Sequence, residues 1–376
     1  MNRTRIITAA ALTLTIAALT LAGPINPPAG PVTSTYKTLT EVEPRIAINA
    51  TNTPGDADSL FKITQRGSYY LTGNITGLVG KHGIEIVASG VTLDLMGFDL
   101  VGIPGMGAFD GVSATVNSLT DITIRNGSVR NWGDEGVDLG SNFADNSAII
   151  DVRASGNIGN GITISTGCTI TGCTAFGNIG NGISTSNGCT ITGCAAPFNS
   201  GMGISIGGGC TITGCSAYLN NGSGISTGSG CTITGCSAYS NFGDGISTNS
   251  TTSISNCTAR INTLDGIRVF SDCLILANMC SANGNGGDGA GIHATGSDNR
   301  IEGNNCTDND RGIDVDVAGN FIIKNTCSGN TINWTIAANN VVGPILDRTA
   351  PASAAISGNS APDSTGSTHP NANFTY

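Results

Sequence analysis

Three residue types that could do chemistry occur at one repeated position near the end of the 376-residue chain. Arg268, His293 and Asp314 each come directly after a Gly-Ile dipeptide. An arginine or histidine next to a carboxylate can exchange a proton with a substrate such as a uronic acid. These three residues are therefore the candidate catalytic residues of the chain.

Further charged residues lie close to these three. Asp316 is two positions beyond Asp314, so a strand would place both side chains on one side. Asp265, Asp310 and Arg311 fall in the corners before the same strands, and together with Asp316 they form the predicted ligand-binding set. Calcium prefers oxygen ligands, and the carboxylates that could supply them are Asp308, Asp310, Asp314 and Asp316.

The same charges also have a structural interpretation. Outward charged residues keep a protein soluble, and opposite charges on adjacent strands pair favourably. The step from Gly266 to Gly291 is 25 residues instead of 21, so an inserted loop could disturb the alignment of the group. The sequence leaves both interpretations open.

A second, smaller charged cluster occurs near the other end of the chain. Its members fall on three successive repeat units and are Lys81, His82, Glu85, Asp110, Asp134, Glu135 and Asp138. From Thr163 to Asp244, by contrast, almost no ionisable side chain occurs. General acid–base chemistry is therefore not expected in the middle of the chain.

The elements that would position these residues follow from an internal repeat. Gly-Ile recurs every 21 residues at Gly161, Gly182, Gly203, Gly224, Gly245 and Gly266. It returns at Gly291 and Gly312, and Gly83, Gly111 and Gly136 fit the same phase with looser spacing. Within one unit, residues 161–165 and 168–171 alternate apolar and polar, which is the period of a strand. We therefore predict an all-β, single-stranded right-handed parallel β-helix, a solenoid of about eleven coils, mostly of 21 residues each.

A column of asparagines supports this alignment. Its predicted members are Asn131, Asn157, Asn178, Asn199, Asn220, Asn241, Asn262, Asn283, Asn309 and Asn330. Asparagine tolerates the left-handed backbone of a sharp corner, and its amide can bond the same residue on the next coil. We interpret the column as structural.

Cysteine and threonine form further columns. One cysteine column is Cys168, Cys189, Cys210, Cys231 and Cys273, and the other is Cys173, Cys194, Cys215, Cys236 and Cys257, continued by Cys280, Cys306 and Cys327. Stacked inward, free cysteine packs as a small apolar residue. Disulfides within a coil, such as Cys168 to Cys173, are the alternative. The threonine pairs, predicted to point outward, are Thr169 and Thr171, Thr190 and Thr192, Thr211 and Thr213, and Thr232 and Thr234, followed by Ser253 and Ser255.

The beginning of the chain is typical of an export signal. Two arginines within residues 1–5 precede an apolar run over residues 6–21, and small residues suit cleavage near Ala22. A retained membrane anchor is the alternative, although the run is short for a spanning helix. We expect a signal peptide over 1–22, an extended lead-in and N-terminal cap over 23–60, the β-helix over 61–346, and a flexible tail or cap over 347–376. The protein would then be secreted or part of the cell envelope, with no transmembrane segment after signal removal.

Residues 67–75, Gly83-Ile84-Glu85-Ile86 and residues 91–98 carry a familiar pattern. They resemble the entry coils of bacterial parallel β-helix repeat proteins, a group that includes the periplasmic copper-associated NosD proteins and many polysaccharide-acting enzymes. The later Asn-x-x-Gly-Ile units look like the same repeat, so the resemblance covers about residues 61–346. It implies the fold and a role with carbohydrate, while the same fold hosts lyases, hydrolases, epimerases, adhesins and binding proteins.

The predicted function is a secreted β-helix that binds, or cleaves, an acidic polysaccharide or cell-surface glycan on its outer face. No complete catalytic constellation is present; as an enzyme it would be a polysaccharide lyase or a glycoside hydrolase. One alternative is a structural or adhesin-type solenoid without activity. Another is ice binding through the threonine pairs. The net charge of −10 argues against a nucleic-acid partner, calcium is the one cofactor considered, and the oligomeric state is not predicted.

Overall fold

A computed structural model describes residues 43–140, 144–347, 349 and 369–376. The chain divides into two units, residues 1–44 and 45–376. The predicted signal peptide, residues 1–22, lies outside the described residues, as does most of the predicted C-terminal tail. In the described part, every regular element is a strand and no helix is long and apolar enough to cross a membrane. All of these strands belong to the second unit, residues 45–376.

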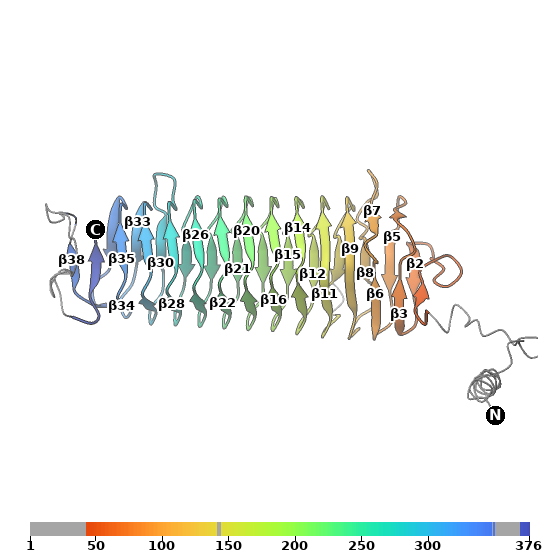
Figure 1. Ribbon diagram of the computed structural model, residues 1–376, viewed down its shortest axis with the longest axis horizontal. Coiled ribbons are helices and arrows are strands. Elements are labelled where there is room, and N and C mark those ends of the chain that lie inside the picture. The colour runs from red at the N-terminus through yellow and green to blue at the C-terminus, as the bar shows by residue number, and fades with distance from the viewer. Residues whose placement is uncertain (1–42, 141–143, 348, 350–368) are drawn as a thin grey trace, which may run out of the picture. The chain divides into compact units, whose positions relative to one another are not determined.

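One sheet contains 13 parallel strands, one from each coil (Figure 1). Their bounds in chain order are β2 Ser59–Ile63, β5 His82–Ile86, β8 Val112–Ala114, β10 Val137–Leu139, β12 Ile162–Ile164, β15 Ile183–Thr185, β18 Ile204–Ile206, β21 Ile225–Thr227, β24 Ile246–Thr248, β27 Ile267–Val269, β30 Ala290–Ala294, β33 Arg311–Val315 and β36 Ile332–Ile336. Each strand pairs with the next in this series, as in Ile183↔Ile204.

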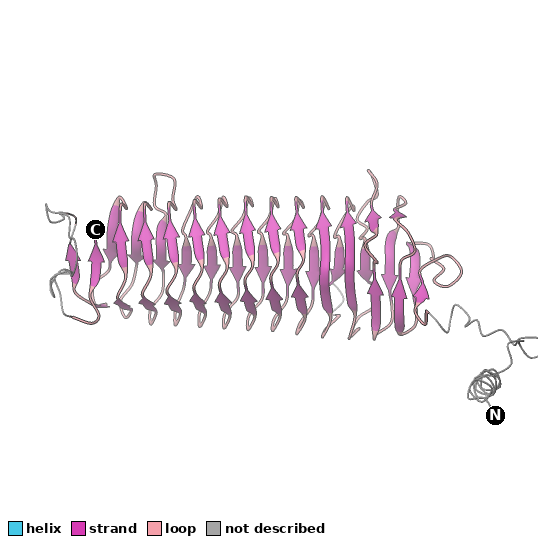
Figure 2. Ribbon diagram, viewed as in Figure 1, coloured by secondary structure: helices cyan, strands magenta, loops and turns pink. Residues whose placement is uncertain are grey.

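The remaining strands join into a second, 26-stranded parallel sheet that wraps the other sides of the coils (Figure 2). Its strands are β1 Ile46–Ala47, β3 Gly67–Tyr70, β4 Ile75–Thr76, β6 Val91–Asp94, β7 Asp99–Val101, β9 Thr123–Arg130, β11 Ala148–Ser155, β13 Thr169–Thr171, β14 Thr174–Phe176, β16 Thr190–Thr192, β17 Ala195–Pro197, β19 Thr211–Thr213, β20 Ser216–Tyr218, β22 Thr232–Thr234, β23 Ser237–Tyr239, β25 Ser253–Ser255, β26 Thr258–Arg260, β28 Leu274–Leu276, β29 Met279–Ser281, β31 Arg300–Glu302, β32 Asn305–Thr307, β34 Phe321–Ile323, β35 Thr326–Ser328, β37 Val341–Val342, β38 Ile345–Asp347 and β39 Asn373–Thr375. β39 pairs with both β35 and β38.

The predicted parallel solenoid is confirmed, with slightly more coils than the predicted eleven. The two coils that the repeat did not reveal are terminal: β2 and β36 continue the 13-stranded sheet at its two ends. At the position where the inner coils have isoleucine or valine, β2 has Phe61 and β36 has Trp334. These two strands therefore lack the Gly-Ile signature.

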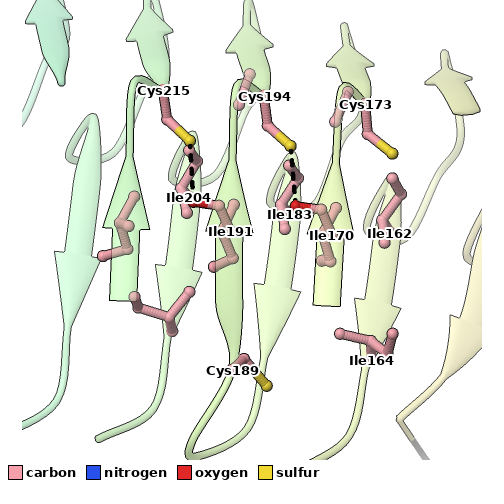
Figure 3. Close-up of a cluster of buried hydrophobic side chains, with 14 of the residues drawn as sticks. Ile162, Ile164, Ile170, Cys173, Ile183, Cys189, Ile191, Cys194, Ile204 and Cys215 are labelled. Atoms are coloured by element: carbon pink, nitrogen blue, oxygen red, sulfur yellow. Dashed lines mark hydrogen bonds between the residues drawn. The ribbon is translucent and has the colours of Figure 1, made fainter. Parts of the chain in front are cut away.

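Inward side chains form the core because apolar and polar residues alternate along each short strand. Ile162, Ile183 and Ile204 stack in one column of the interior, and Ile170 and Ile191 stack in another (Figure 3). The glycine before each isoleucine lies very close to the following coil. A Cβ atom on Gly203 would be 2.6 Å from the carbonyl oxygen of Gly224, which explains why the repeat requires glycine here.

The asparagine ladder is present and buried, although it begins one coil later than predicted. Each amide Nδ2 donates to the Oδ1 of the next member, at 2.9 Å from Asn157 to Asn178, and to a backbone carbonyl. Asn131 is not a member: it is exposed, has a φ of 60° and precedes the residue in register with Asn157. That residue is the buried Trp132, whose backbone N–H donates to the Asn157 side chain.

All thirteen cysteines are free and buried, so the structure contains no disulfide such as Cys168–Cys173. The thiols from Cys168 to Cys273 donate to backbone carbonyls, as in Cys194 Sγ to Ile170 O at 3.7 Å (Figure 3). The prediction that Cys280, Cys306 and Cys327 continue the Cys257 column is wrong, because Cys280 pairs with Ala259, and Cys306 and Cys327 follow Cys280 in that alanine column.

Asparagine replaces cysteine in the later coils, which the sequence analysis did not foresee. The backbone N–H of Cys257 donates to Asn278 Oδ1, and a second ladder runs on through Asn304, Asn325 and Asn373. Cysteine and asparagine occupy the same corner because both can donate to a carbonyl of an adjacent coil.

Candidate functional site

The 13-stranded sheet aligns the three candidate catalytic residues as predicted. Arg268 on β27 pairs with His293 on β30, and His293 pairs with Asp314 on β33. Because side chains of paired residues in a parallel sheet project from the same face, the three form one outward column. The extra residues between Gly266 and Gly291 extend as a loop before β30 and leave the register intact (Figure 1).

His293 is held between two carboxylates. Its Nδ1 is 2.8 Å from Asp265 Oδ2 and its Nε2 is 3.1 Å from Asp316 Oδ2, and its side chain is 17% exposed. Burial lowers the pKa of His293, but the hydrogen bond and charge of Asp265, with the charges of Asp316 and Asp314, outweigh it and raise the pKa to about 9. The ring is therefore an imidazolium at neutral pH, and could act as a general base only at higher pH.

Arg311 and Asp310 connect this column to the inserted loop. Arg311 makes ion pairs with the buried Asp314 and with the exposed Asp288 of the loop. Asp310 accepts hydrogen bonds from the backbone N–H groups of Gly286 and Gly287, at 3.1 and 2.8 Å to its Oδ2. The predicted ligand-binding residues Asp310 and Arg311 thus hold the loop in place.

A cleft of about 340 Å³ lies between this loop and the sheet. Its lining residues are Asp244, Thr263, Leu264, Asp265, Arg268, Asn285, Gly287, Asp288, Gly289 and His293. Arg268 is exposed, and the structure gives it no ion pair with any described residue. Burial, followed by the negative charge of Asp265, raises the pKa of Asp244. The cleft therefore combines an exposed arginine, whose charge acts on the nearby Asp244, with several hydrogen-bond acceptors.

The four aspartates proposed as calcium ligands are only partly brought together. Asp314 and Asp316 join His293 in a group whose potential ligand atoms lie within 4.8 Å of one another, and this group does not include Asp308 or Asp310. Asp308 is an exposed corner residue with a φ of 59°. Arg311 and His293 already pair with the two grouped carboxylates. The set is thus less oxygen-rich than calcium prefers.

The smaller cluster at the other end of the β-helix consists of two groups. Lys62, which the sequence analysis did not single out, pairs with the buried Glu85 at 2.8 Å. Asp110 contacts His82 at 3.4 Å and lies beside Glu135 and Asp134. Burial, together with Asp134 and the nearby aspartates, raises the pKa of Glu135 to about 8.

Two further members are Asp138, whose charge helps to raise the pKa of Glu135, and Lys81. Asp138 lies on β10, paired with Thr163 of β12, and Lys81 donates to the backbone oxygen of Ser59 at 3.3 Å.

Sequence reasoning missed Asp244 and the apolar wall that Leu264 provides. Asp244 lies 21 residues before Asp265, and its Oδ1 accepts a hydrogen bond from the Asp265 backbone N–H at 3.2 Å. The recurrence of aspartate at this repeat position was the available signal. Leu264 occupies a position that is glycine one coil earlier, at Gly243, which is visible only once the repeat is aligned.

The fold was compared with solved structures. The A-modules of two mannuronan C-5 epimerases from Azotobacter vinelandii, AlgE6 and AlgE4, align with TM-scores of 0.50 and 0.45 and identities of 15% and 16%. These alignments cover 80% and 74% of this chain and 88% and 91% of the modules. PfbA, a surface adhesin of Streptococcus pneumoniae, aligns with a TM-score of 0.36 and 12% identity over 72% of this chain and 83% of its own. At such identities the likeness to the AlgE6 module shows the fold.

Sequence comparisons give the family. Among curated proteins, no sequence match was found. The family model described as the right handed beta helix region matches residues 165–299 and 208–360, which together span more than half of the chain. With the parallel coils of the structure, this match shows that the chain belongs to the right-handed β-helix family.

Proposed function

We propose that this protein binds an acidic polysaccharide outside the cytoplasm, in the cleft beside β27 and β30. The observation that carries the proposal is Arg268, an exposed guanidinium without an ion pair in the described structure, on the wall of a cleft of about 340 Å³. Guanidinium groups bind carboxylates through two parallel hydrogen bonds. A uronic acid carboxylate could accept both of these hydrogen bonds.

The other cleft residues suit the rest of a sugar. Asp244, Asp265 and Asp288 offer oxygen atoms that can accept hydrogen bonds from hydroxyl groups. Leu264 is 53% exposed and gives the apolar side of a sugar ring a surface to pack against. Clefts that combine an apolar wall with a few fixed polar groups are typical ligand sites.

Binding is favoured over cleavage by the state of His293. With a pKa of about 9, the ring is already protonated at neutral pH, and both of its nitrogen atoms are engaged by carboxylates. It therefore cannot accept a proton from a uronic acid there. We assign His293 the role of a charged group that positions Asp265 in the cleft wall.

Affinity electrophoresis through gels that contain polyuronates or neutral polysaccharides tests the proposal. The protein should be retarded by a polyuronate and run freely in neutral gels, and Arg268→Ala should be retarded clearly less. Arg66→Ala is the matched control, because Arg66 is exposed at the opposite end of the β-helix without an ion pair in the described structure. Repeating the gels with calcium and with a chelator tests the ion. Free migration in every gel would contradict the proposal and favour a purely structural role.

A second candidate function, ice binding, rests on the threonine pairs. Thr190 and Thr192 on β16 are exposed and pair with Thr211 and Thr213 on β19, and the neighbouring coils repeat the pattern. The result is a regular two-column array of hydroxyl and methyl groups spaced about 4.8 Å apart along the solenoid. Thermal hysteresis of the purified protein, abolished by Thr190→Tyr, would establish this function, and its absence in the wild type would exclude it.

A further inference from the structure

A row of exposed aromatic rings runs along the outer face formed by β14, β17, β20 and β23. Phe176 and Phe198 are both 48% exposed, and Tyr239 is 40% exposed. The ring centroids are 5.4 Å apart between Phe176 and Phe198, 5.8 Å between Phe198 and Tyr218, and 4.9 Å between Tyr218 and Tyr239. Four rings from four successive coils therefore form one continuous strip.

The strip continues across a coil that lacks an aromatic residue in the strand itself. Pro197 of β17 pairs with Tyr218 of β20, so proline occupies the aromatic column there. Phe198, the next residue, reaches both neighbouring rings from a corner position with a φ of 60°. A bulky residue in this left-handed region is strained, and Phe198 closes the gap that Pro197 leaves in the strip.

Two arginines lie near the ends of the strip: Arg260 in the column of the rings, and Arg153 in the neighbouring outward column, because Ser155 is the β11 residue that pairs with Phe176. Arg153 on β11 pairs with Thr174 of β14, and Arg260 on β26 pairs with Tyr239 of β23. Both arginines are exposed, and the structure gives neither an ion pair with a described residue. Five strand pairings separate the two strands, which corresponds to about 24 Å at about 4.8 Å per coil.

Few charged residues lie near the strip: Arg260 at one end, and Arg153 with the exposed Asp151 of the same strand at the other. Residues 154–243 contain no Asp, Glu, Lys, Arg or His, and Asp244 is the only such residue from there to 259. The acidic residues are thus concentrated in the coils toward the two ends of the β-helix. At physiological ionic strength the influence of an exposed charge falls off within about 8 Å, so Arg153, Asp151 and Arg260 are the charges that act on the two ends of the strip.

We propose that this face, defined by Arg153, Phe176, Phe198, Tyr218, Tyr239 and Arg260 and called here the aromatic face, binds a linear acidic glycan that lies along the solenoid. The exposed rings would pack against the apolar faces of successive sugars, and the two arginines would bind carboxylates at either end. Contiguous exposed apolar patches mark interaction or ligand-binding sites on soluble proteins. The ligand class is that of the proposed function, but the surface is separate from the cleft.

A glycan chain suits this face better than a globular partner because of its shape. The rings follow a straight line one coil at a time, which matches a ligand built of regularly repeated units. A second outward column, with Ser216 on β20, Ser237 on β23 and Thr258 on β26, runs parallel to the rings and offers a hydroxyl group at each of these coils. Such hydroxyls can exchange hydrogen bonds with those of a sugar.

Isothermal titration calorimetry with oligomannuronate and oligogalacturonate tests the proposal in the Arg268→Ala background, where the cleft is impaired. Adding Tyr218→Ala and Tyr239→Ala together should weaken the remaining affinity by about tenfold or more. Adding Arg153→Ala and Arg260→Ala instead should abolish the preference for these acidic chains over a neutral maltooligosaccharide. Tyr239→Phe keeps the ring and should bind like its parent, as should Phe270→Ala, which removes a ring outside the strip that is 53% exposed.

The outcomes separate this proposal from the function proposed for the cleft. If Arg268→Ala alone removes all binding, the aromatic face is not a glycan site and the cleft proposal stands. If Arg268→Ala binds as tightly as the wild type and the tyrosine pair loses binding, the aromatic face is the site and the cleft is not. Loss of self-association in the tyrosine pair, with glycan binding unchanged, would show a contact between copies and overturn the proposal. Circular dichroism confirms that each variant is folded.

Discussion

Replacing Asn220 by alanine should reveal how much the buried asparagine ladder contributes to the β-helix. Asn220 is fully buried, and its Nδ2 donates to Ala196 O and to Asn241 Oδ1, both at 2.9 Å. Its Oδ1 accepts two hydrogen bonds from Asn199, from the backbone N–H at 2.9 Å and from the side-chain amide at 3.1 Å. Alanine removes all four interactions.

The magnitude depends on the groups that remain without a partner. The two donors of Asn199 lose their acceptor inside the wall of the coil, where water does not replace it. A buried donor without a partner costs about 1–3 kcal/mol, so two of them lower the free energy of unfolding by about 2–6 kcal/mol. Asn221→Ala is the matched control: its side chain is exposed, its backbone bond to Asn199 is retained, and its effect should stay within about 0.5 kcal/mol.

Urea unfolding followed by far-ultraviolet circular dichroism measures the difference between the two variants. Because a solenoid can unfold locally, hydrogen exchange of the peptides around residues 195–225 should be measured as well. We expect faster exchange in Asn220→Ala than in Asn221→Ala. Equal stabilities of the two variants, or a loss below about 1 kcal/mol for Asn220→Ala, would refute the structural role of the ladder.

Three further predictions address other features of the structure. His293 should titrate with a pKa of about 9 in an NMR titration. Because this pKa lies above the ordinary histidine value of 6.5, the protonated ring stabilises the fold fully below pH 6.5, and this stabilisation disappears as the pH rises through 9. The difference in melting temperature between wild type and His293→Gln should therefore shrink over that range. All thirteen cysteines should resist a thiol reagent in the folded protein and react in denaturant, and rapid labelling of the native state would contradict their burial. Gly224→Ala should lower the free energy of unfolding by about 1–3 kcal/mol, because the new Cβ atom would lie 2.6 Å from Asn241 Nδ2. Gly73→Ala is the control, because a Cβ atom there has no other atom within 4 Å, and it should leave the stability unchanged.

Much of the fold and part of the candidate site could be predicted because the repeat fixes which residues lie on the same face. The spacing of Gly-Ile placed Arg268, His293 and Asp314 in one column, and the strand pairing agrees. Where the period changes, the prediction fails. Matching cysteines by residue type places Cys280 in the Cys257 column, whereas the strand pairing puts it opposite Ala259.

The repeat could not predict contacts between side chains on either side of a corner. The bond between His293 and Asp265 joins residues 28 positions apart, and its existence depends on the path of the loop before β30. The aromatic face was missed for a similar reason: Pro197 interrupts the column in the sequence, and only the corner geometry of Phe198 joins the rings. The sequence period predicts which residues share a column. Contacts between side chains of different columns can be identified only in the three-dimensional structure.

The proposed function depends on Arg268 binding a uronic acid in the cleft. The most direct test is calorimetric titration of an oligouronate into wild type, Arg268→Ala and Arg66→Ala at one ionic strength. A hydrogen bond to a charged group contributes about 1.5–3 kcal/mol, so Arg268→Ala should weaken binding at least about tenfold, and Arg66→Ala should bind like the wild type. Equal affinities for all three proteins would contradict the claim.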